Sequence, residues 1–400
     1  MQKTLLIFCF ILFKACSSYA QQSAIYPSSK TLKVNAEKSR ALRNIKPVAE
    51  KTEDEYLQFD HASSVKHYIH DKTTIPFSMP HKTYNFLSEG ICLLHNFEGV
   101  PGVGMPNPDT EGDAGPYHYF QMVKSSFAIW DKTGTLLYGP AANKTLWSDL
   151  PGPWHNHQWT DPIVQYDHLK DKWLASCMVY DLYNVYWEMI AVSVSGDPLD
   201  EWNLYAFEFS NMPDYPKFGV WPDGYYLSVN EYDFSRENAF AGASVLVFNK
   251  DDMIEGIPDP RYVYFHLETT LEEPDIYNEL SSFQPSDLDG NPPDTPAPNY
   301  FLCMKDDAWG WDHDQLRVWE CHVNWNQPEI SVFEETAVLP VSDFNSNTEA
   351  FEYVSQPNGN HLHSLSHFLM YRLQYRNFDD YEVLLTNHTI DVDSLHAGVR

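Results

Sequence analysis

Residues 161–181, DPIVQYDHLKDKWLASCMVYD, and residues 186–209, YWEMIAVSVSGDPLDEWNLYAFEF, decide the fold of this chain. Four runs rich in Val, Ile, Tyr, Phe and Trp alternate here with turns that contain Asp, Gly and Pro. β-Branched and aromatic side chains suit the pleated surface of a strand, and no sustained helical period crosses the runs. The stretch therefore predicts four consecutive β-strands.

Similar units recur along the chain, and their openings lie roughly fifty residues apart at first and further apart later. They begin at Tyr117, with a hairpin turn at residues 131–134, at Tyr215, at Pro298 and at Leu362. Periods of this length are typical of β-propeller blades with loop insertions. We therefore predict an all-β fold, a β-propeller of four-stranded blades, and the alternative is a β-sandwich. The chain stops at residues 397–400 as an apolar run begins, so we expect the ring to be incomplete at its C-terminus.

The N-terminal residues resemble an export signal. Lys3 is followed by an apolar run at residues 5–13 and by small residues at 18–20, which predicts a signal peptide over residues 1–20 and a secreted, cell-surface or periplasmic protein. The apolar run is too short to cross a bilayer. Residues 21–88 are polar and predict a basic leader or linker with one short helix near residues 36–42. The propeller-like domain is expected over residues 89–400.

The formal net charge of −30 is unevenly distributed. Residues 21–51 are rich in Lys and Arg, so the remainder of the chain is more acidic than the average. Such a surface repels phosphate backbones, which argues against a nucleic-acid partner. It suits cations and neutral ligands, or it simply keeps an exported protein soluble. The sequence does not indicate an oligomeric state.

Six strings carry a family resemblance: PDTEGDAGPYHYFQMVKSSFAIWDKTG (108–134), DPIVQYDHLKDKWLAS (161–176), YPKFGVWPDGYYLSVN (215–230), YFLCMKDDAWGW (300–311), LMYRLQYRNF (369–378) and NHTIDVD (387–393). Together they resemble a largely uncharacterised family of secreted bacterial β-propeller-like proteins. Many of its members end in a sorting tail for outer-membrane secretion, and they continue past the point where this chain ends. The resemblance implies the fold and a truncated chain, and it implies no specific activity.

Carboxylates precede several of the predicted inner strands, where propeller sites collect. Asp109, Glu111 and Asp113 alternate in NPDTEGDAG, a spacing that can surround calcium with oxygen ligands, although Asp-capped turns have the same appearance. Calcium is the candidate metal at these three residues, and no cofactor is required. Asp161 opens the second unit, and Asp287 occupies a similar place in a later unit. Two such carboxylates facing each other could act as acid and base on a glycosidic bond.

A second set of residues lies close to predicted strand starts: His118, Tyr215, Lys217, Arg372, Tyr375 and His388. A His or Tyr base beside an Arg that neutralises a uronate would suit a polysaccharide lyase, whereas Tyr375 can equally pack on the sheet. We therefore predict a glycan-directed protein, either a polysaccharide hydrolase or a lyase. The alternative is a non-catalytic carbohydrate binder or an adhesive surface protein. Cys303 and Cys321 lie on neighbouring predicted strands, and either one disulfide or two buried thiols is expected.

Overall fold

The computed structural model describes residues 24–49, 95–101, 108–180, 185–236, 239–294, 296–346, 352–355, 361–363, 365–393 and 396–399. Strands dominate this part of the chain, and its only α-helix is the short α2 (Lys250–Glu255). The all-β prediction is therefore confirmed. No helix in these ranges is long and apolar enough to span a membrane. The predicted signal at residues 1–20 lies outside the described residues.

Four antiparallel units follow one another along the chain, and each contains four strands in sequence. The first consists of β3 (Glu111–Ala114), β4 (His118–Val123), β5 (Ser126–Asp131) and β6 (Leu136–Ala142). The second consists of β7 (Gln158–Asp167), β8 (Lys172–Tyr180), β9 (Tyr186–Ser193) and β10 (Trp202–Phe209). The third consists of β11 (Met212–Val220), β12 (Gly224–Tyr232), β13 (Phe240–Asn249) and β14 (Tyr262–Leu267). The fourth consists of β15 (Gln284–Leu288), β16 (Asn299–Lys305), β17 (Gln315–His322) and β18 (Val332–Pro340).

A fifth group of strands is attached to the fourth unit. In this group β21 (Leu369–Asn377) pairs with β22 (Glu382–Asp393), which pairs with β23 (His396–Val399). β21 also pairs in parallel with β15, with Ser286 opposite Leu373. β19 (Glu352–Ser355) and β20 (His361–His363) form a separate ribbon. Within the described residues the sheets do not join into a closed ring, and they do not form the two packed sheets of a sandwich.

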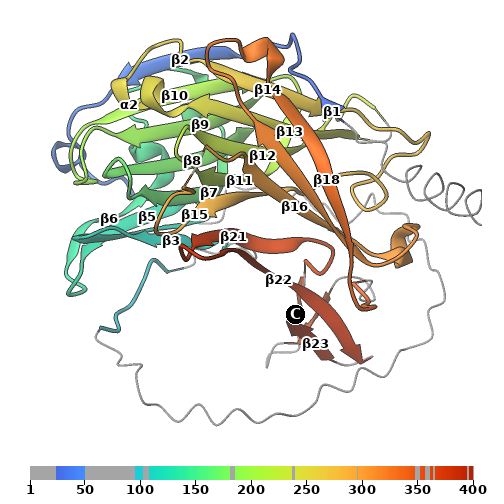
Figure 1. Ribbon diagram of the computed structural model, residues 1–400. Coiled ribbons are helices and arrows are strands. Elements are labelled where there is room, and N and C mark those ends of the chain that lie inside the picture. The colour runs from blue at the N-terminus through green and yellow to red at the C-terminus, as the bar shows by residue number, and fades with distance from the viewer. Residues whose placement is uncertain are drawn as a thin grey trace, which may run out of the picture.

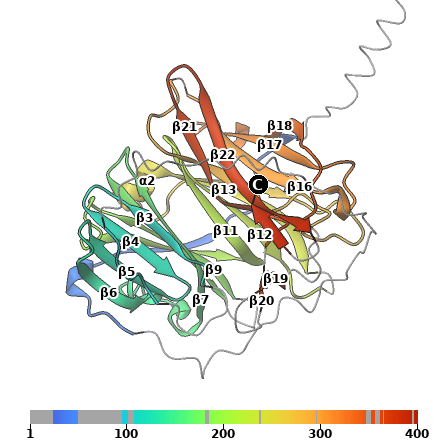
Figure 2. The same ribbon diagram turned by 90° about the horizontal axis from the view of Figure 1, so that it is seen from below.

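The first strand of each group lies in the middle of the molecule (Figures 1 and 2). These inner strands are β3, β7, β11, β15 and β21. Each contacts the next one in this order: β3 contacts β7, β7 contacts β11, β11 contacts β15, and β15 contacts β21. Large apolar side chains fill the space between successive sheets. Trp173 and Trp202 belong to the core between the first and second sheets, Phe218 and Phe248 to the next, and Trp319 to the one after. Bulky aromatic residues on facing sheets thus fix the inner strands around a common centre.

Residues 24–49, which we call the belt, run along the outer edges of the sheets. β1 (Ala24–Ile25) pairs with β18, and β2 (Lys33–Lys38) adds a fifth strand beside β10. Between them the Ser28 amide donates to the Tyr264 carbonyl of β14 at 2.7 Å. After a 3₁₀ turn (Leu42–Asn44), the Ala142 amide of β6 donates to the Val48 carbonyl at 2.7 Å. The belt therefore contacts the outer strand of each of the four units: β6, β10, β14 and β18.

The belt differs from the leader and the short helix that the sequence suggested. Its described part pairs with the sheets, and residues 33–38 form a strand instead of a helix. Charge provides a physical reason, because its cations meet carboxylates of the acidic body. These ion pairs are Lys30–Glu231, Lys33–Glu208, Lys38–Glu201, Arg40–Asp149, Arg43–Asp197 and Arg43–Asp200. Residues 50–88 of the expected leader lie outside the described part.

Candidate functional site

Arg372 of β21 connects the inner strands at the centre of the molecule. Its Nη1 lies 3.2 Å from Asp113 Oδ2 of β3 and 3.5 Å from Asp287 Oδ2 of β15. Its Nη2 donates to the carbonyls of Gly112 at 3.3 Å and Val164 at 3.1 Å. We call these five residues the hub. Asp287 Oδ1 also accepts from the Val220 amide of β11, so the hub reaches all five inner strands.

A second charged group lies beside the hub, towards the starts of β3 and β7. Lys124, which follows β4, places Nζ 2.6 Å from Asp109 Oδ2 and 3.7 Å from Asp161 Oδ1. The Thr160 hydroxyl donates to the same Asp161 oxygen at 2.7 Å. Asp109 and Asp161 are 35% and 21% exposed, so both carboxylates reach solvent. Lys124 thus links Asp109 and Asp161 in one charged group.

Tyr215 and Lys217 on β11 join the two groups. The Lys217 ammonium lies 3.8 Å from the centre of the Tyr215 ring and donates to the Pro216 carbonyl at 2.9 Å. The Tyr215 hydroxyl interacts electrostatically with Asp161, Glu111 and Asp109. Within the described residues, Lys217 forms no ion pair with a carboxylate. We call Asp109, Glu111, Lys124, Asp161, Tyr215 and Lys217 the candidate site.

The backbone of the candidate site is unusual. Asp109, Lys124, Asp161 and Tyr215 have φ angles of 40°, 41°, 48° and 57°, a region that residues other than glycine rarely adopt. Asp161 and Tyr215 lie at bulges, where the β7–β8 and β11–β12 registers shift. Bulges redirect side chains, and strained backbone persists only where the surroundings impose it. Their concentration at one place indicates a functional site.

Burial changes the protonation of two carboxyl groups near the centre. Desolvation raises the pKa of Glu111 to about 7, although Arg372 and Lys217 oppose the shift. Desolvation likewise raises the pKa of Asp287 to about 7 against the effect of Arg372. Burial and the charge of Asp161 raise the pKa of Asp109, and Lys124 opposes this shift. Glu111 and Asp287, which can keep a proton near neutral pH, therefore lie close to Asp109 and Asp113, which bind Lys124 and Arg372.

The structure brings some of the sequence-predicted residues together and separates others. Asp109, Glu111, Asp161, Tyr215 and Lys217 meet in the candidate site, and Asp113 meets Arg372 in the hub. His118 lies 3.8 Å from Asp197 in the β9–β10 turn, and the His388 ring packs 4.7 Å from the Phe344 ring. The Tyr375 side chain is buried with its ring 4.8 Å from that of Trp221, so it serves the core.

The predicted calcium ligands do not form one compact group. Asp109 contacts Lys124, whereas Asp113 contacts Arg372. Across the described ranges, the acidic residues with ligand atoms within 4.8 Å of one another are Asp306, Asp307 and Asp314. Two of these carboxylates already accept backbone amides, from Ala308 and Phe344 among others. Calcium at Asp109, Glu111 and Asp113 stays a prediction.

Sequence reasoning missed Lys124 and a buried carboxyl, Glu188. Lys124 stands in an ordinary strand-to-turn segment, MVKSS, and only its positive φ and its contacts mark it. Glu188 gave a readable signal, because it is the one charged residue in the apolar run YWEMIAVSV of β9. A charged residue in the middle of a fully buried strand is rare unless it has a specific role.

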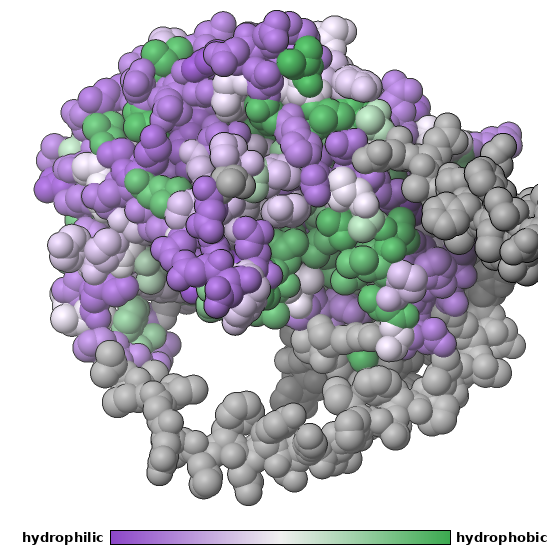
Figure 3. Space-filling view, in the orientation of Figure 1, coloured by the Kyte–Doolittle hydropathy of each residue, from purple (hydrophilic) through white to green (hydrophobic). Residues whose placement is uncertain are grey.

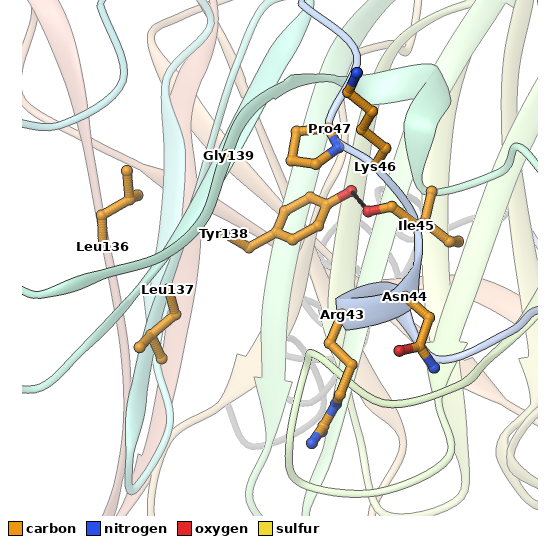
Figure 4. Close-up of a pocket in the computed structure, with 9 residues that line it drawn as sticks. All are labelled: Arg43, Asn44, Ile45, Lys46, Pro47, Leu136, Leu137, Tyr138 and Gly139. Carbon is orange, nitrogen blue, oxygen red and sulfur yellow. Dashed lines mark hydrogen bonds between the residues drawn. The ribbon is translucent and has the colours of Figure 1, made fainter.

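Two surface features lie away from the candidate site. A cavity of about 470 Å³ separates the belt from β6, and Figure 4 shows Tyr138 crossing it to donate to the Ile45 carbonyl at 3.0 Å. Arg43 and Lys46 line this cavity, and no carboxylate does. The face shown in Figure 3 is largely hydrophilic, with an apolar patch over the C-terminal half of β18, where Leu339 is 46% exposed. Neither feature contains the chemistry found at the centre.

Comparisons with known proteins give only distant similarities. No protein-family model matches the sequence, and no curated protein matches it. Among solved structures, the chain is similar to an exo-β-1,3-galactanase from Clostridium thermocellum at 10% identity, with a TM-score of 0.37, over 76% of this chain and 58% of that chain. It is also similar to a GH43_1 enzyme from Xanthomonas citri complexed with xylose (12%, TM-score 0.34, 74% and 86%) and to an α-L-arabinofuranosidase from Lactobacillus brevis (8%, TM-score 0.35, 74% and 90%). The chain thus spans little more than half of the galactanase.

Proposed function

We propose that this protein is an exported glycoside hydrolase, that its sheets are blades of a β-propeller, and that it cleaves a glycan at the candidate site. The observation that carries the proposal is the presence in one site of Glu111, a carboxyl whose pKa is raised to about 7, and Asp161, whose carboxyl lies 3.7 Å from the Lys124 ammonium; the Tyr215 hydroxyl interacts electrostatically with both acids. Glycosidic bonds are cleaved by such pairs, one protonated and one ionised. Export rests on the predicted signal at residues 1–20.

Glu111 is the proton donor in this proposal. Its raised pKa lets it hold a proton at neutral pH and transfer it to the leaving oxygen of the glycosidic bond. Asp161 acts from β7 on the anomeric carbon, either directly or through a water molecule. Lys124 and the Thr160 hydroxyl orient the Asp161 carboxyl. The half-buried Tyr215 ring and the Lys217 ammonium over it then contact the sugar ring.

The hydrolase accounts for the geometry better than a lyase. The lyase hypothesis needs an Arg available to a uronate and a His or Tyr that accepts a proton. Both terminal nitrogens of Arg372 are already engaged within the hub, and His118 and His388 lie elsewhere. Burial raises the pKa of Tyr215 far above its ordinary value, which makes it a poor base.

A first test compares Glu111→Gln, Asp161→Asn and the control Asp223→Asn on a panel of plant and algal oligosaccharides. Asp223 is a matched control because burial raises its pKa as well, but it hydrogen-bonds Tyr226 in the β11–β12 turn. We expect wild type to show a bell-shaped pH profile whose alkaline limb falls near pH 7, where Glu111 loses its proton. Glu111→Gln should lower kcat by about 10²–10⁴-fold.

Leaving-group chemistry separates the two roles. An aryl glycoside with an acidic phenol needs no proton donor, so Glu111→Gln should recover most of its activity on that substrate, whereas Asp161→Asn should not. Asp223→Asn should match wild type on both substrates. Unsaturated products would indicate a lyase. Binding without cleavage across the panel, or equal activity of Glu111→Gln and wild type, would overturn the proposal.

A further inference from the structure

Glu188 is a fully buried carboxyl without a partner. Its exposed fraction is 0%, and neither of its carboxyl oxygens has a hydrogen-bond partner. A buried carboxylate normally needs a cation or several donors, because transfer of the charge out of water costs far more than an isolated hydrogen bond returns. Glu188 has neither, so physical chemistry requires it to keep a proton.

The register of the second sheet places Glu188 behind Asp161. Glu188 of β9 lies opposite Met178 of β8, and Met178 lies opposite Thr160 of β7. Asp161 occupies the bulge next to Thr160, so its backbone is two strand spacings from Glu188, about 10 Å. The Ser176 side chain, also without a hydrogen-bond partner, is diagonal to Glu188 on β8. The carboxyl groups of Glu188 and Asp161 interact electrostatically across this separation.

The surroundings of Glu188 leave its charge uncompensated. Desolvation raises the pKa of Glu188 well above its ordinary value. The nearby Ser176 hydroxyl of β8 and, to a smaller extent, Lys217 of β11 oppose this rise, whereas Asp161 of β7 adds to it. The buried Cys177 thiol of β8 also interacts with Glu188 and keeps its own proton. Phe207 of β10 is apolar, and α2, which also contacts β9, directs Lys250 to Asp167 instead.

We propose that Glu188 is a positioning residue of the candidate site, a carboxylic acid held neutral behind Asp161 so that Asp161 carries the negative charge of the pair. Two like charges at this separation would repel, and this repulsion adds to the desolvation that keeps the proton on Glu188. Burial assigns that proton to Glu188, since Asp161 has solvent, Lys124 and Thr160 available. The catalytic part of this inference rests on the proposed hydrolase, whereas the protonation of Glu188 does not.

Unfolding of Glu188→Gln tests the protonation without any substrate. In wild type the unfolded chain releases this proton above its ordinary pKa near 4.5, whereas the folded chain retains it, so ionisation increasingly favours unfolding as pH rises. Gln is neutral in both states and removes this effect. The folding constant of Glu188→Gln relative to wild type should therefore increase about tenfold per pH unit, or about 100-fold between pH 5 and pH 7.

Glu231 supplies a matched control, since it is equally buried but well partnered. It binds Lys30 and accepts from Ser244 and Asn211, and its pKa is lowered. Its stabilising effect is present above its ordinary pKa and is lost only as pH falls below it. The Glu231→Gln folding constant should therefore be lower than that of wild type by a factor that stays constant from pH 5 to pH 7.

Activity provides the second readout. If Glu188 positions Asp161 by staying neutral, Glu188→Gln should move the pH profile of kcat, because the high-pH ionisation of Glu188 is removed, while Glu188→Asp should restore the wild-type profile in part. Parallel stability curves for Glu188→Gln and Glu231→Gln would overturn the inference. If Glu188→Gln gains stability with rising pH but no glycan is cleaved by wild type, the protonation of Glu188 stands and only the proposed hydrolase is refuted.

Discussion

Removal of Arg372 should cost more stability than the loss of any surface ion pair, because four inner-strand contacts depend on it. Arg372→Met keeps the length of the side chain and removes the guanidinium. Asp287, only 6% exposed, then loses its cation, and the carbonyls of Gly112 and Val164 lose their donor. Removal of one partner from a buried ion pair costs about 3–5 kcal/mol. We expect the free energy of unfolding to fall by this amount.

Arg376→Met is the matched control on the same strand. Arg376 also lies 3.5 Å from an aspartate, Asp289, but its side chain is 52% exposed. An exposed pair contributes about 1 kcal/mol or less, so this variant should unfold almost like wild type. Urea unfolding followed by tryptophan fluorescence measures both, since large buried tryptophans such as Trp173 and Trp202 report on the core.

The pH dependence of the Arg372→Met deficit provides the sharper check. The raised pKa of Asp287, about 7, means that this carboxyl is ionised above neutral pH and protonated below it. In the variant, Asp287 is a buried charge without its cation only when it is ionised. The loss of unfolding free energy should therefore be largest at about pH 8 and should shrink towards about pH 5. Asp287→Asn should recover part of the loss at high pH. A deficit as small as that of Arg376→Met, or one independent of pH, would refute the role of the hub.

Further predictions concern the belt and the cysteines. Lys30→Met should lower the unfolding free energy by about 2–3 kcal/mol, because its partner Glu231 is fully buried. Lys33→Met should change it by about 1 kcal/mol or less, because Lys33 and its partner Glu208 are exposed. Urea unfolding measures both, and equal effects would contradict a special role for the buried Lys30–Glu231 pair. Cys303 and Cys321 should react as free thiols after denaturation without reductant. Their register offset of four residues, together with the spacing of the two strands, separates their Cα atoms by about 14 Å, which is too far for a disulfide. A linked peptide in mass spectrometry would contradict this prediction.

The sequence was sufficient to predict most of the strands, because they run apolar or aromatic between turns with clear chemistry. The turn after β5 is an example, since Asp131 accepts from the amides of Thr133 and Thr135, and Gly134 supplies a φ of 89°. The predicted unit openings at Tyr117 and Pro298 left out the inner strands β3 and β15, whose sequences EGDA and QPSDL are polar. The belt could not be predicted in the same way. β2, KVNAEK, is half-exposed and has no distinctive period, and its partner Glu208 lies 175 residues from Lys33. Long-range pairing of a polar strand leaves little trace in local composition.

The candidate site was predictable in its carboxylates and not in its geometry. The alternating carboxylates of NPDTEGDAG made Asp109 and Glu111 candidates as calcium ligands, and the place of Asp161 at a unit opening made it a candidate for catalysis. The positive φ of Asp161 and Tyr215 could not be inferred, since glycine or asparagine is the usual signal for that conformation. The assignment of Asp113 to Arg372 also depends on a contact across 259 residues. Such contacts arise from how the sheets are arranged around their centre.

The hub holds the strands that carry the strained residues of the candidate site. Each residue other than glycine held at a positive φ costs about 1–3 kcal/mol, so Asp161 and Tyr215 relax unless their strands are fixed. Arg372 fixes β7 through the Val164 carbonyl, and Asp287 fixes β11 through the Val220 amide. The stability supplied by the hub is comparable to the strain that it supports. Weakening the hub should therefore disorder the candidate site before it unfolds the sheets.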